Sequence, residues 1–454
     1  MEATPLETIA RWAGGQLLAG DALATVRQVC TDSRALQPGD LFVALRGEKF
    51  DAHEFAAEAA RRGAAAVIGE RIPEGFSPGC GLILVADSLV ALQQLARSYR
   101  QTLALQVVGL TGSNGKTSTK DLTAAVLGAR FQVTKTAGNF NNHIGLPLTM
   151  LRARASDQIG VFEMGMNHPG EIAPLAALAA PDVGIVTNIG TAHIEHLGSR
   201  EAIAQEKGML AEAVNASGTV ILNGDDEFTD SIALRTRADV LLAGLVRGEV
   251  RGEALRADFE GTRFDLVARG QRVEAWLPIP GEHMVRNALL AVAAGLVFGL
   301  GLEECAQALS RVELTKGRLE RKSVRGIHLL DDTYNANPES VCAALRTLAA
   351  LPATGRRIAV LGRMGELGVE SERGHRQVGA VAAEIRVDCL LCVGEEAHWI
   401  ADAATQGGVA QVVKVRDTDE ATAALRESAR PGDLVLVKGS RSARMERIVE
   451  GLAT

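Results

Sequence analysis

Short apolar runs alternate with amphipathic segments along most of the chain, a pattern typical of α/β proteins. Residues 1–101 read as a small α/β domain in which a helix at 89–99 follows apolar strands. Strand–helix alternation then continues through residues 102–314, as in a mostly parallel sheet, and restarts in residues 315–454. We therefore predict three domains with these boundaries, the last of them Rossmann-like and doubly wound.

Polar residues gather where the predicted strands end. Glu163 lies near the end of a strand at 158–164, and His193 follows a strand at 183–189. Ligands of open α/β sheets bind at the carboxyl ends of strands, so both side chains are candidates for a site. Two further β-rich stretches are predicted at 240–246 and 262–277.

One stretch indicates what the central sheet binds. Residues 107–118 read Val-Val-Gly-Leu-Thr-Gly-Ser-Asn-Gly-Lys-Thr-Ser, an apolar strand, a glycine-containing loop and a helix start. Such a loop cradles phosphate with backbone N–H groups, and Lys116 would reach the β- and γ-phosphates while Thr117 ligates Mg²⁺. The general pattern places its first glycine at position 110, which is leucine here, so the loop is a variant. We predict a P-loop-type, mononucleotide-binding parallel sheet.

Composition narrows the function classes. The net charge of −7 and the pI of about 5.8 argue against a general nucleic-acid binder. No run approaches the roughly 18 apolar residues of a membrane helix, and the start of the chain lacks a signal-peptide pattern. Cys389 and Cys392 are the one close cysteine pair, and they lie in an apolar run that predicts buried thiols rather than a metal or redox site. We expect a soluble, cytoplasmic monomer.

Several of these residues also fit ordinary structural roles. Glu163 could cap a neighbouring helix instead of binding Mg²⁺, and a lone histidine such as His193 is more often structural. Lys207, on a predicted helix, reads as a solvated lysine. The polar residues at 32–34 and His53 fit turns and caps. The residues alone leave these alternatives open.

The chain resembles the Mur ligases over essentially its whole length. The resemblance rests on Thr-Gly-Ser-Asn-Gly-Lys-Thr, whose glycine spacing shares the variant form, and on motifs at 138–147, 163–171, 192–199, 331–338 and 437–442. The sequence Tyr-Asn-Ala-Asn-Pro at 334–338 is typical of family members that add D-alanyl-D-alanine.

The resemblance implies an ATP-dependent ligase that joins D-alanyl-D-alanine to a UDP-N-acetylmuramoyl-tripeptide through an acyl-phosphate, for peptidoglycan. It implies ATP, two Mg²⁺ ions and a CO₂-derived carbamate on Lys207 as cofactors. The implied catalytic residues are Lys116, Glu163, His193 and Lys207, and the implied metal ligands are Thr117, Glu163 and His193. The implied ATP-binding residues are Gly112, Ser113, Asn114, Gly115, Lys116, Thr117, Ser118, His283, Asn287, Arg318 and Asp332.

The two other substrates are implied to bind at the outer domains. The UDP-substrate residues are Ser33, Arg34, Gly47, Asp51, His53, Asn139, Asn141 and Asn142. The residues at the dipeptide or acyl end are Asn335, Asn337, Lys438, Ser440 and Arg441. Residues 1–101 would thus hold the UDP-sugar-peptide, and residues 315–454 the incoming dipeptide.

Four positions depart from the family pattern, one of them Thr187, which with Asn188 stands where Asn-Asn is expected. Glu282 and Met284 stand where a basic residue and an asparagine are expected, and Arg363 stands where an aspartate is expected. The sequence leaves open whether the third peptide residue is diaminopimelate or lysine. Rival interpretations are another amide-forming ligase, such as the diaminopimelate- or lysine-adding enzymes or folylpolyglutamate synthetase, a P-loop phosphotransferase, and a non-catalytic nucleotide-gated protein.

Overall fold

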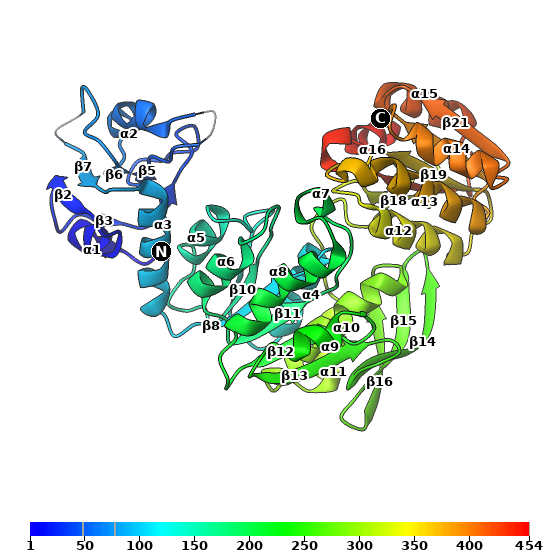
Figure 1. Cartoon of the computed structure of the whole chain (residues 1–454), viewed down its shortest axis with the longest axis horizontal. Helices are drawn as coiled ribbons and strands as arrows, with labels where there is room; N and C mark the ends of the chain where they lie inside the picture. The colour runs from blue at the N-terminus through cyan, green and yellow to red at the C-terminus, as the bar shows by residue number, and fades with distance from the viewer. Residues whose placement is uncertain (48–49, 77–78, 454) are drawn as a thin grey trace. The chain divides into compact units, whose positions relative to one another are not determined.

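The fold is seen in a computed structural model that describes residues 1–47, 50–76 and 79–453 (Figure 1). The chain forms two compact units. The first contains Met1–Gly109, Phe131–Gly165 and Glu171–Asp182, and the second contains Leu110–Arg130, Met166–Gly170 and Val183–Thr454. Residues 48 and 49, within the predicted substrate segment 47–53, lie outside the described residues. No helix in the described ranges is long and apolar enough to cross a membrane.

The first unit begins with a mixed sheet in the order β2-β7-β6-β5-β4, in which β2 is antiparallel to β7 and the other pairs are parallel. Its strands are β2 (Gln16–Ala19), β4 (Val29–Cys30), β5 (Leu41–Val43), β6 (Ala66–Gly69) and β7 (Gly81–Leu84). A separate two-stranded sheet pairs β1 (Thr4–Pro5) with β3 (Thr25–Val26) in antiparallel orientation. Its helices are α1 (Leu6–Trp12), α2 (Ala56–Arg61) and α3 (Ser88–Gln101), preceded by the short η1 (Ala52–Phe55). The helix predicted at 89–99 is confirmed as α3, whose start Asp87 caps by accepting from two backbone N–H groups.

The same unit also holds β9 (Val133–Lys135) and β10 (Ile159–Glu163), which pair in parallel, with α5 (Gly145–Met150) and α6 (Ile172–Ala179). Strand β10 confirms the strand predicted at 158–164. All its residues are buried, and Glu163 is its last residue. A carboxylate is therefore held at a buried strand end.

The central part of the second unit follows the phosphate loop, which joins β8 (Gln106–Thr111) to α4 (Lys116–Leu127). The parallel strands are β11 (Val183–Val186), β12 (Thr219–Asn223), β13 (Asp239–Gly244) and β14 (Val250–Asp258), continued by antiparallel β15 (Gly261–Ala268) and β16 (Gln271–Leu277). The helices are α7 (Ile194–Leu197), α8 (Arg200–Ala213), α9 (Thr229–Ala233), α10 (Glu282–Val297) and α11 (Leu302–Leu309), and α10 packs against α4. The strand predicted to run to residue 189 ends at Val186, because the chain then turns to follow the phosphate loop.

The C-terminal sheet has the order β17-β18-β22-β19-β20-β21. Its strands are β17 (Glu320–Val324), β18 (Ile327–Asp332), β19 (Arg357–Gly362), β20 (Cys389–Val393), β21 (Gln411–Val415) and β22 (Leu434–Lys438). Its helices are α12 (Pro338–Ala350), α13 (Ser371–Glu384), α14 (His398–Gln406), α15 (Thr418–Ser428) and α16 (Glu446–Ala453), with the short η2 (Gly368–Glu370) and η3 (Arg441–Ala443). The pairs from β18 onward are parallel, and the unpredicted β17 adds an antiparallel edge.

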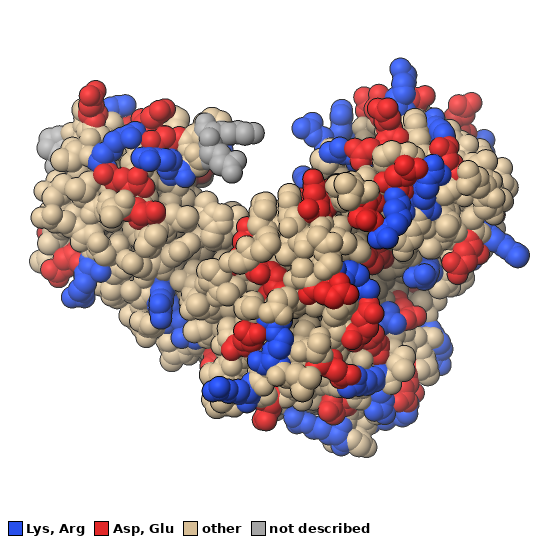
Figure 2. Space-filling model, in the orientation of Figure 1, with Lys and Arg blue, Asp and Glu red and all other residues tan. Residues whose placement is uncertain are grey.

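Two further features follow from the packing. Cys389 and Cys392 are buried in β20, and burial raises the pKa of Cys392 to about 12, so the prediction of buried strand thiols is confirmed. The linker into the C-terminal sheet is tied to α4, because the backbone N–H and hydroxyl of Thr315 both donate to Asp121, at 3.0 and 2.8 Å. Figure 2 shows both signs of charge interspersed over the visible face of the described surface.

Candidate active site

The phosphate loop is braced by the chain that follows β11. Asn188 accepts from the backbone N–H of Ser113 with its carbonyl and from that of Asn114 with its side chain, both at 2.9 Å. The hydroxyl of Thr187 donates to the Asn114 carbonyl at 2.6 Å. A Cβ at Gly112 would lie 1.8 Å from that hydroxyl oxygen, so only glycine fits there. Contacts within the protein therefore fix the shape of the loop.

The loop's lysine and the start of α4 face the same place. Lys116 donates from Nζ to the Gly112 carbonyl at 2.8 Å, which folds its side chain over the loop. Thr117 and Ser118 are buried in the first turn of α4, where N–H groups and the helix dipole favour an anion. Gly115, at φ +78°, lies so close to Asn287 on α10 that an added Cβ would meet Asn287 Oδ1 at 2.5 Å. Asn287, which is predicted to bind ATP, is thus placed beside the phosphate loop.

The departures on α10 have partners of their own. The side-chain amide of Asn287 lies 3.8 Å from the sulfur of Met284, within hydrogen-bonding distance for sulfur. Glu282 pairs with Arg286 one helical turn later, at 2.5 Å. Met284 and Glu282, the two residues that depart from the family pattern, therefore both contact other residues of α10.

A cluster of charges from the C-terminal sheet reaches the same helix start. Arg318 donates to the Thr117 hydroxyl at 3.2 Å and lies 4.1 Å from the ring centroid of Tyr334. Asp332, at the end of β18, pairs with Lys438, at the end of β22, at 2.6 Å. His283 is near both, and burial lowers its pKa to about 4, opposed by the charge of Asp332. The structure thus brings together five predicted residues from segments that lie far apart in sequence.

Lys207 is the most unusual lysine of the described chain. It lies on α8 with no exposed surface, and its Nζ has no hydrogen-bond partner among the described residues. Burial, followed by the charge of Lys116, lowers its pKa well below the ordinary value. The amine is therefore buried within the field of the phosphate-loop lysine, and its full burial excludes the alternative of a solvated lysine.

Glu163, in the first unit, is buried at the end of β10. One carboxylate oxygen accepts from the Asn141 amide at 2.8 Å, while Oε2 has no hydrogen-bond partner among the described residues. Its backbone N–H donates to the Thr136 hydroxyl at 2.9 Å. Asn142 accepts from the backbone N–H of Gly145 at 2.8 Å and so helps to start α5, and Asn139 lies in the same loop. The loop around Asn139 to Asn142 thus positions the Glu163 carboxylate, and one oxygen of that carboxylate has no hydrogen-bond partner in the described chain.

The predicted UDP-substrate residues of the N-terminal sheet fall into two groups. Arg34 is exposed and bonds Asp32, at 2.9 and 2.8 Å, which lowers the pKa of Asp32 to about 2; Ser33 lies between them in the same turn. His53 is buried, with Nδ1 2.6 Å from Asp51 and Nε2 accepting from the Glu70 N–H at 2.9 Å. Gly47 bonds the carbonyl of residue 50. Both ring nitrogens of His53 are therefore engaged within the domain.

The C-terminal sheet contacts the chain around His193 as well. The Thr191 N–H and hydroxyl each donate to Glu339, at 2.9 Å. His193 has φ +63°, and its Nδ1 lies 2.6 Å from Oε2 of Glu366, in the loop after β19. This contact lowers the pKa of Glu366. Sequence reasoning missed Glu339 and Glu366, because a partner across two sheets leaves no local pattern.

The residues predicted at the dipeptide end do not all face one place. Asn337 caps α12 and donates to the side chain of Asn114 at 2.7 Å, whereas the Asn335 carbonyl accepts from Lys438 at 2.9 Å. Arg441 is exposed and pairs with Glu446 at 3.3 Å. Ser440 is buried, and its N–H donates to the Arg363 carbonyl at 2.9 Å. Arg363, the departure from the family pattern, bonds Ser442 and Glu396, at 2.9 and 3.1 Å.

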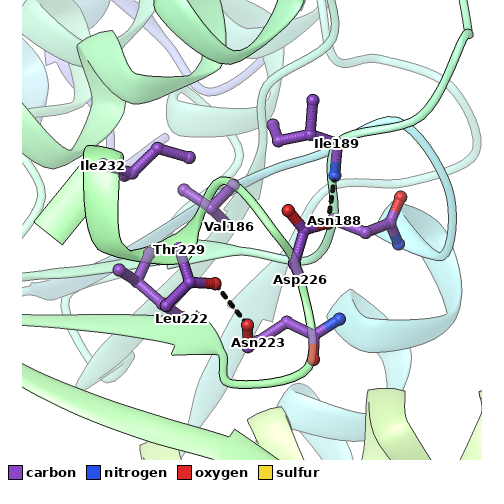
Figure 3. A pocket seen from close by; sticks show the side chains of 8 residues that line it. All are labelled: Val186, Asn188, Ile189, Leu222, Asn223, Asp226, Thr229 and Ile232. Carbon is purple, nitrogen blue, oxygen red and sulfur yellow. Dashed lines mark hydrogen bonds between the residues drawn. The ribbon is translucent and has the colours of Figure 1, made fainter. Parts of the chain in front are cut away.

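A small pocket lies behind the brace, between the ends of β11 and β12 (Figure 3). Apolar and polar residues line it in equal number, and its one carboxylate, Asp226, accepts from the Ile189 N–H at 2.8 Å. The pocket has room only for a water-sized molecule. Its polar groups therefore hold the strand end that braces the loop, rather than a nucleotide.

Comparisons with known proteins agree with this architecture. Family models match as the Mur ligase family, catalytic domain (residues 25–100), the Mur ligase middle domain (110–295) and the Mur ligase, glutamate ligase domain (317–441). The UDP-N-acetylmuramoyl-tripeptide–D-alanyl-D-alanine ligase of Bacillus subtilis is 39% identical, covering 94% of this chain and 93% of that protein.

Solved structures are similar over the whole chain. A crystal structure of MurF from Acinetobacter baumannii has a TM-score of 0.91 at 31% identity, covering 100% of this chain and 99% of that one. The MurF ligase of Thermotoga maritima in complex with ADP has a TM-score of 0.85 at 29% identity, covering 94% and 97%. The chain belongs to the Mur ligase family.

Proposed function

We propose that this protein is the ATP-dependent ligase that joins D-alanyl-D-alanine to UDP-N-acetylmuramoyl-tripeptide, the last cytoplasmic step in making the peptidoglycan precursor. The observation that carries the proposal is the 39% identity to a protein of that name over nearly the full length of both chains. The braced phosphate loop, with Arg318 on Thr117, gives the activity a physical basis. We place the protein in the cytoplasm as a monomer.

The proposed division of labour follows the three predicted domains. Residues 1–101 bind the UDP-sugar-peptide, residues 102–314 bind ATP, and residues 315–454 bind the dipeptide. Separate family models matching each part support this division. The ADP complex of the similar Thermotoga maritima ligase supports ATP as the nucleotide.

We propose that two Mg²⁺ ions bind, and the buried carboxylate of Glu163 supports a metal role. Mg²⁺ prefers oxygen ligands, and the Oε2 of Glu163 is a buried carboxylate oxygen without a hydrogen-bond partner in the described chain. We propose Glu163, the Thr117 hydroxyl and His193 as the metal-binding side chains. When bound, Mg²⁺ would offset the negative charge that develops on the transferring phosphoryl group.

A carbamate on Lys207 also fits. Only an uncharged amine attacks CO₂, and burial, followed by the charge of Lys116, lowers the pKa of Lys207 and so favours the uncharged form. Carbamylation would replace a buried amine that has no hydrogen-bond partner in the described chain by an anion, which the positive charge of Lys116 would attract. We propose that this anion orients the metal site.

The chain's own contribution to the reaction is positioning and charge. The loop N–H groups, the start of α4 and Lys116 hold the ATP phosphates, and Arg318 reaches the same place from the C-terminal sheet. The tripeptide carboxylate then attacks the γ-phosphate to give an acyl-phosphate and ADP. The dipeptide amine attacks the acyl carbon, and phosphate leaves. Water must be excluded while the acyl-phosphate exists.

The deciding experiment measures ADP and phosphate release with UDP-N-acetylmuramoyl-tripeptide, with and without D-alanyl-D-alanine. We expect steady release of both products only when both substrates are present. ADP formation without free phosphate would indicate a phosphotransferase and contradict the proposal. Comparing tripeptides that carry diaminopimelate or lysine would identify the third residue.

A further inference from the structure

Glu366 belongs to a loop that its own sheet holds in place. The loop follows β19, and Glu366 adopts a left-handed backbone at φ +62°. The neighbouring Met364 is buried, and its N–H donates to Nε2 of His375 at 3.0 Å. Nδ1 of His375 lies 2.7 Å from the Ser371 carbonyl, and Leu367 is also buried. Since both flanking residues are fixed, the carboxylate of Glu366 is presented from a defined place.

The partner, His193, is also held by its backbone. It precedes α7 with φ +63°, and its carbonyl accepts from the N–H groups of His196 and Leu197, at 3.1 and 3.2 Å. A Cβ added to Gly368 would lie 2.9 Å from Cγ of Glu195, so the two loops are in close contact. The 2.6 Å approach of Glu366 to His193 is therefore part of a packed junction.

The chemistry of imidazole indicates which ring nitrogen of His193 carries the proton. A neutral imidazole carries one N–H and one lone pair, and a carboxylate can only accept. The Glu366 carboxylate lies 2.6 Å from Nδ1, and its negative charge favours the tautomer with the proton on Nδ1, which leaves the lone pair on Nε2. Histidines that bind metals commonly donate their second nitrogen to a carboxylate in this way, which fixes the ring and strengthens the ligand.

We propose that Glu366 is a positioning residue for His193, holding its ring in the Nδ1–H form with Nε2 available to a divalent metal. The inference rests on the proposed metal role of His193. Because Glu366 belongs to the C-terminal sheet and His193 follows β11, metal binding at His193 depends on the docking of that sheet. The domain proposed to bind the dipeptide would then also complete the metal site.

The first test reads the tautomer of His193 in the full-length protein without metal or nucleotide. Long-range ¹H–¹⁵N correlation spectra distinguish the two forms, and His193→Gln assigns the signal. We expect the Nδ1–H form in the wild type and in Glu366→Gln, whose side-chain carbonyl still accepts. In Glu366→Ala we expect a shift to the Nε2–H form. An Nε2–H wild type, or no change in Glu366→Ala, would overturn the inference.

The second test titrates Mn²⁺ into the ADP-bound protein and follows the electron paramagnetic resonance signal of free Mn²⁺. Loss of a carboxylate behind a ligating histidine typically weakens metal binding by about 10- to 100-fold, which we expect for Glu366→Ala. The matched control is Glu372→Gln, which removes a carboxylate that pairs with Arg376 on the same sheet's helix α13. Its affinity should equal that of the wild type.

The outcomes separate this inference from the proposed function. If His193→Gln weakens Mn²⁺ binding and Glu366→Ala does not, the positioning role is wrong and the metal role of His193 stands. If neither variant changes Mn²⁺ binding, the metal role fails and the inference fails with it. Because about half of the Glu366 side chain is exposed, we expect its variants to fold, which thermal melting would verify.

Discussion

Lys207 is the residue for which stability and activity should respond in opposite directions. The change is Lys207→Met, which keeps the side chain's length and removes the amine. The wild-type amine is fully buried without a hydrogen-bond partner in the described chain, and such a group costs about 1–3 kcal/mol. In CO₂-depleted buffer we therefore expect Lys207→Met to be as stable as the wild type or more stable, by up to about that amount.

Activity should fall in the same variant. Removing one preorganised charged group from an active site typically costs about 10²- to 10³-fold in kcat, or roughly 3–4 kcal/mol. We expect a loss of at least this size for Lys207→Met in the coupled ADP-release assay. In Lys207→Ala, which leaves space, short carboxylates should restore part of the turnover.

The carbamate itself can be observed. With ¹³C-bicarbonate, the wild type should give a carbamate carbon signal that is absent in Lys207→Met. Bicarbonate should also raise the Tm of the wild type only, since a ligand that binds the folded state alone stabilises it. The matched control is Lys120→Met, a lysine just as buried whose amine lies 3.4 Å from Asp121. That variant should keep the signal and lose stability, because its carboxylate partner stays buried. Normal turnover of Lys207→Met, or a persistent carbamate signal, would refute the reasoning.

Three other predictions follow from single contacts. Glu163→Gln keeps the side chain's size and removes its charge, so Mg²⁺-dependent kcat should fall about 10²- to 10³-fold, and an unchanged kcat would exclude a metal role. The pKa of His283 is lowered from 6.5 to about 4, so between these pH values the unfolded chain binds more protons than the folded one. The free energy of unfolding should therefore decrease as the pH falls below 6.5, by up to about 3 kcal/mol at pH 4. In urea titrations, His283→Gln should reduce this dependence of stability on pH. Asn337→Ala removes a helix cap and the contact with Asn114, so it should cost about 1 kcal/mol and raise the KM for ATP, whereas Asp417→Ala, which removes the α15 cap alone, should leave that KM unchanged.

Local patterns predicted much of the fold. The start of α4 and the buried strand before Glu163 follow from apolar runs, glycines and caps, which act between neighbours in sequence. The strand β17 was missed because Glu-Arg-Lys-Ser-Val is mostly polar and becomes a strand only by pairing with β18. The strand β14 was missed because charged and small residues break its alternation, and its register shifts between Glu253 and Arg256.

The sequence predicted which residues belong to the site, but it did not predict which of them contact one another. The resemblance supplied Lys207, whereas its burial without a partner follows only from the packing of α8. The pairing of Asp332 with Lys438, and that of His193 with Glu366, joins segments far apart in the chain. Such contacts depend on which strand ends become adjacent in the fold. The residues next to each strand end in the sequence do not indicate this.

The attachment of Thr315 to Asp121 has a mechanical consequence. Because both the backbone and the hydroxyl of Thr315 are bound to α4, the linker up to this residue moves as one body with the phosphate-loop helix. Any rotation of the C-terminal sheet must then be taken up by the backbone torsions just beyond, where Gly317 already has φ +71°. The hinge would lie within a few residues of Arg318, whose side chain contacts Thr117, so a small change in torsion there would move that guanidinium directly on or off the nucleotide site.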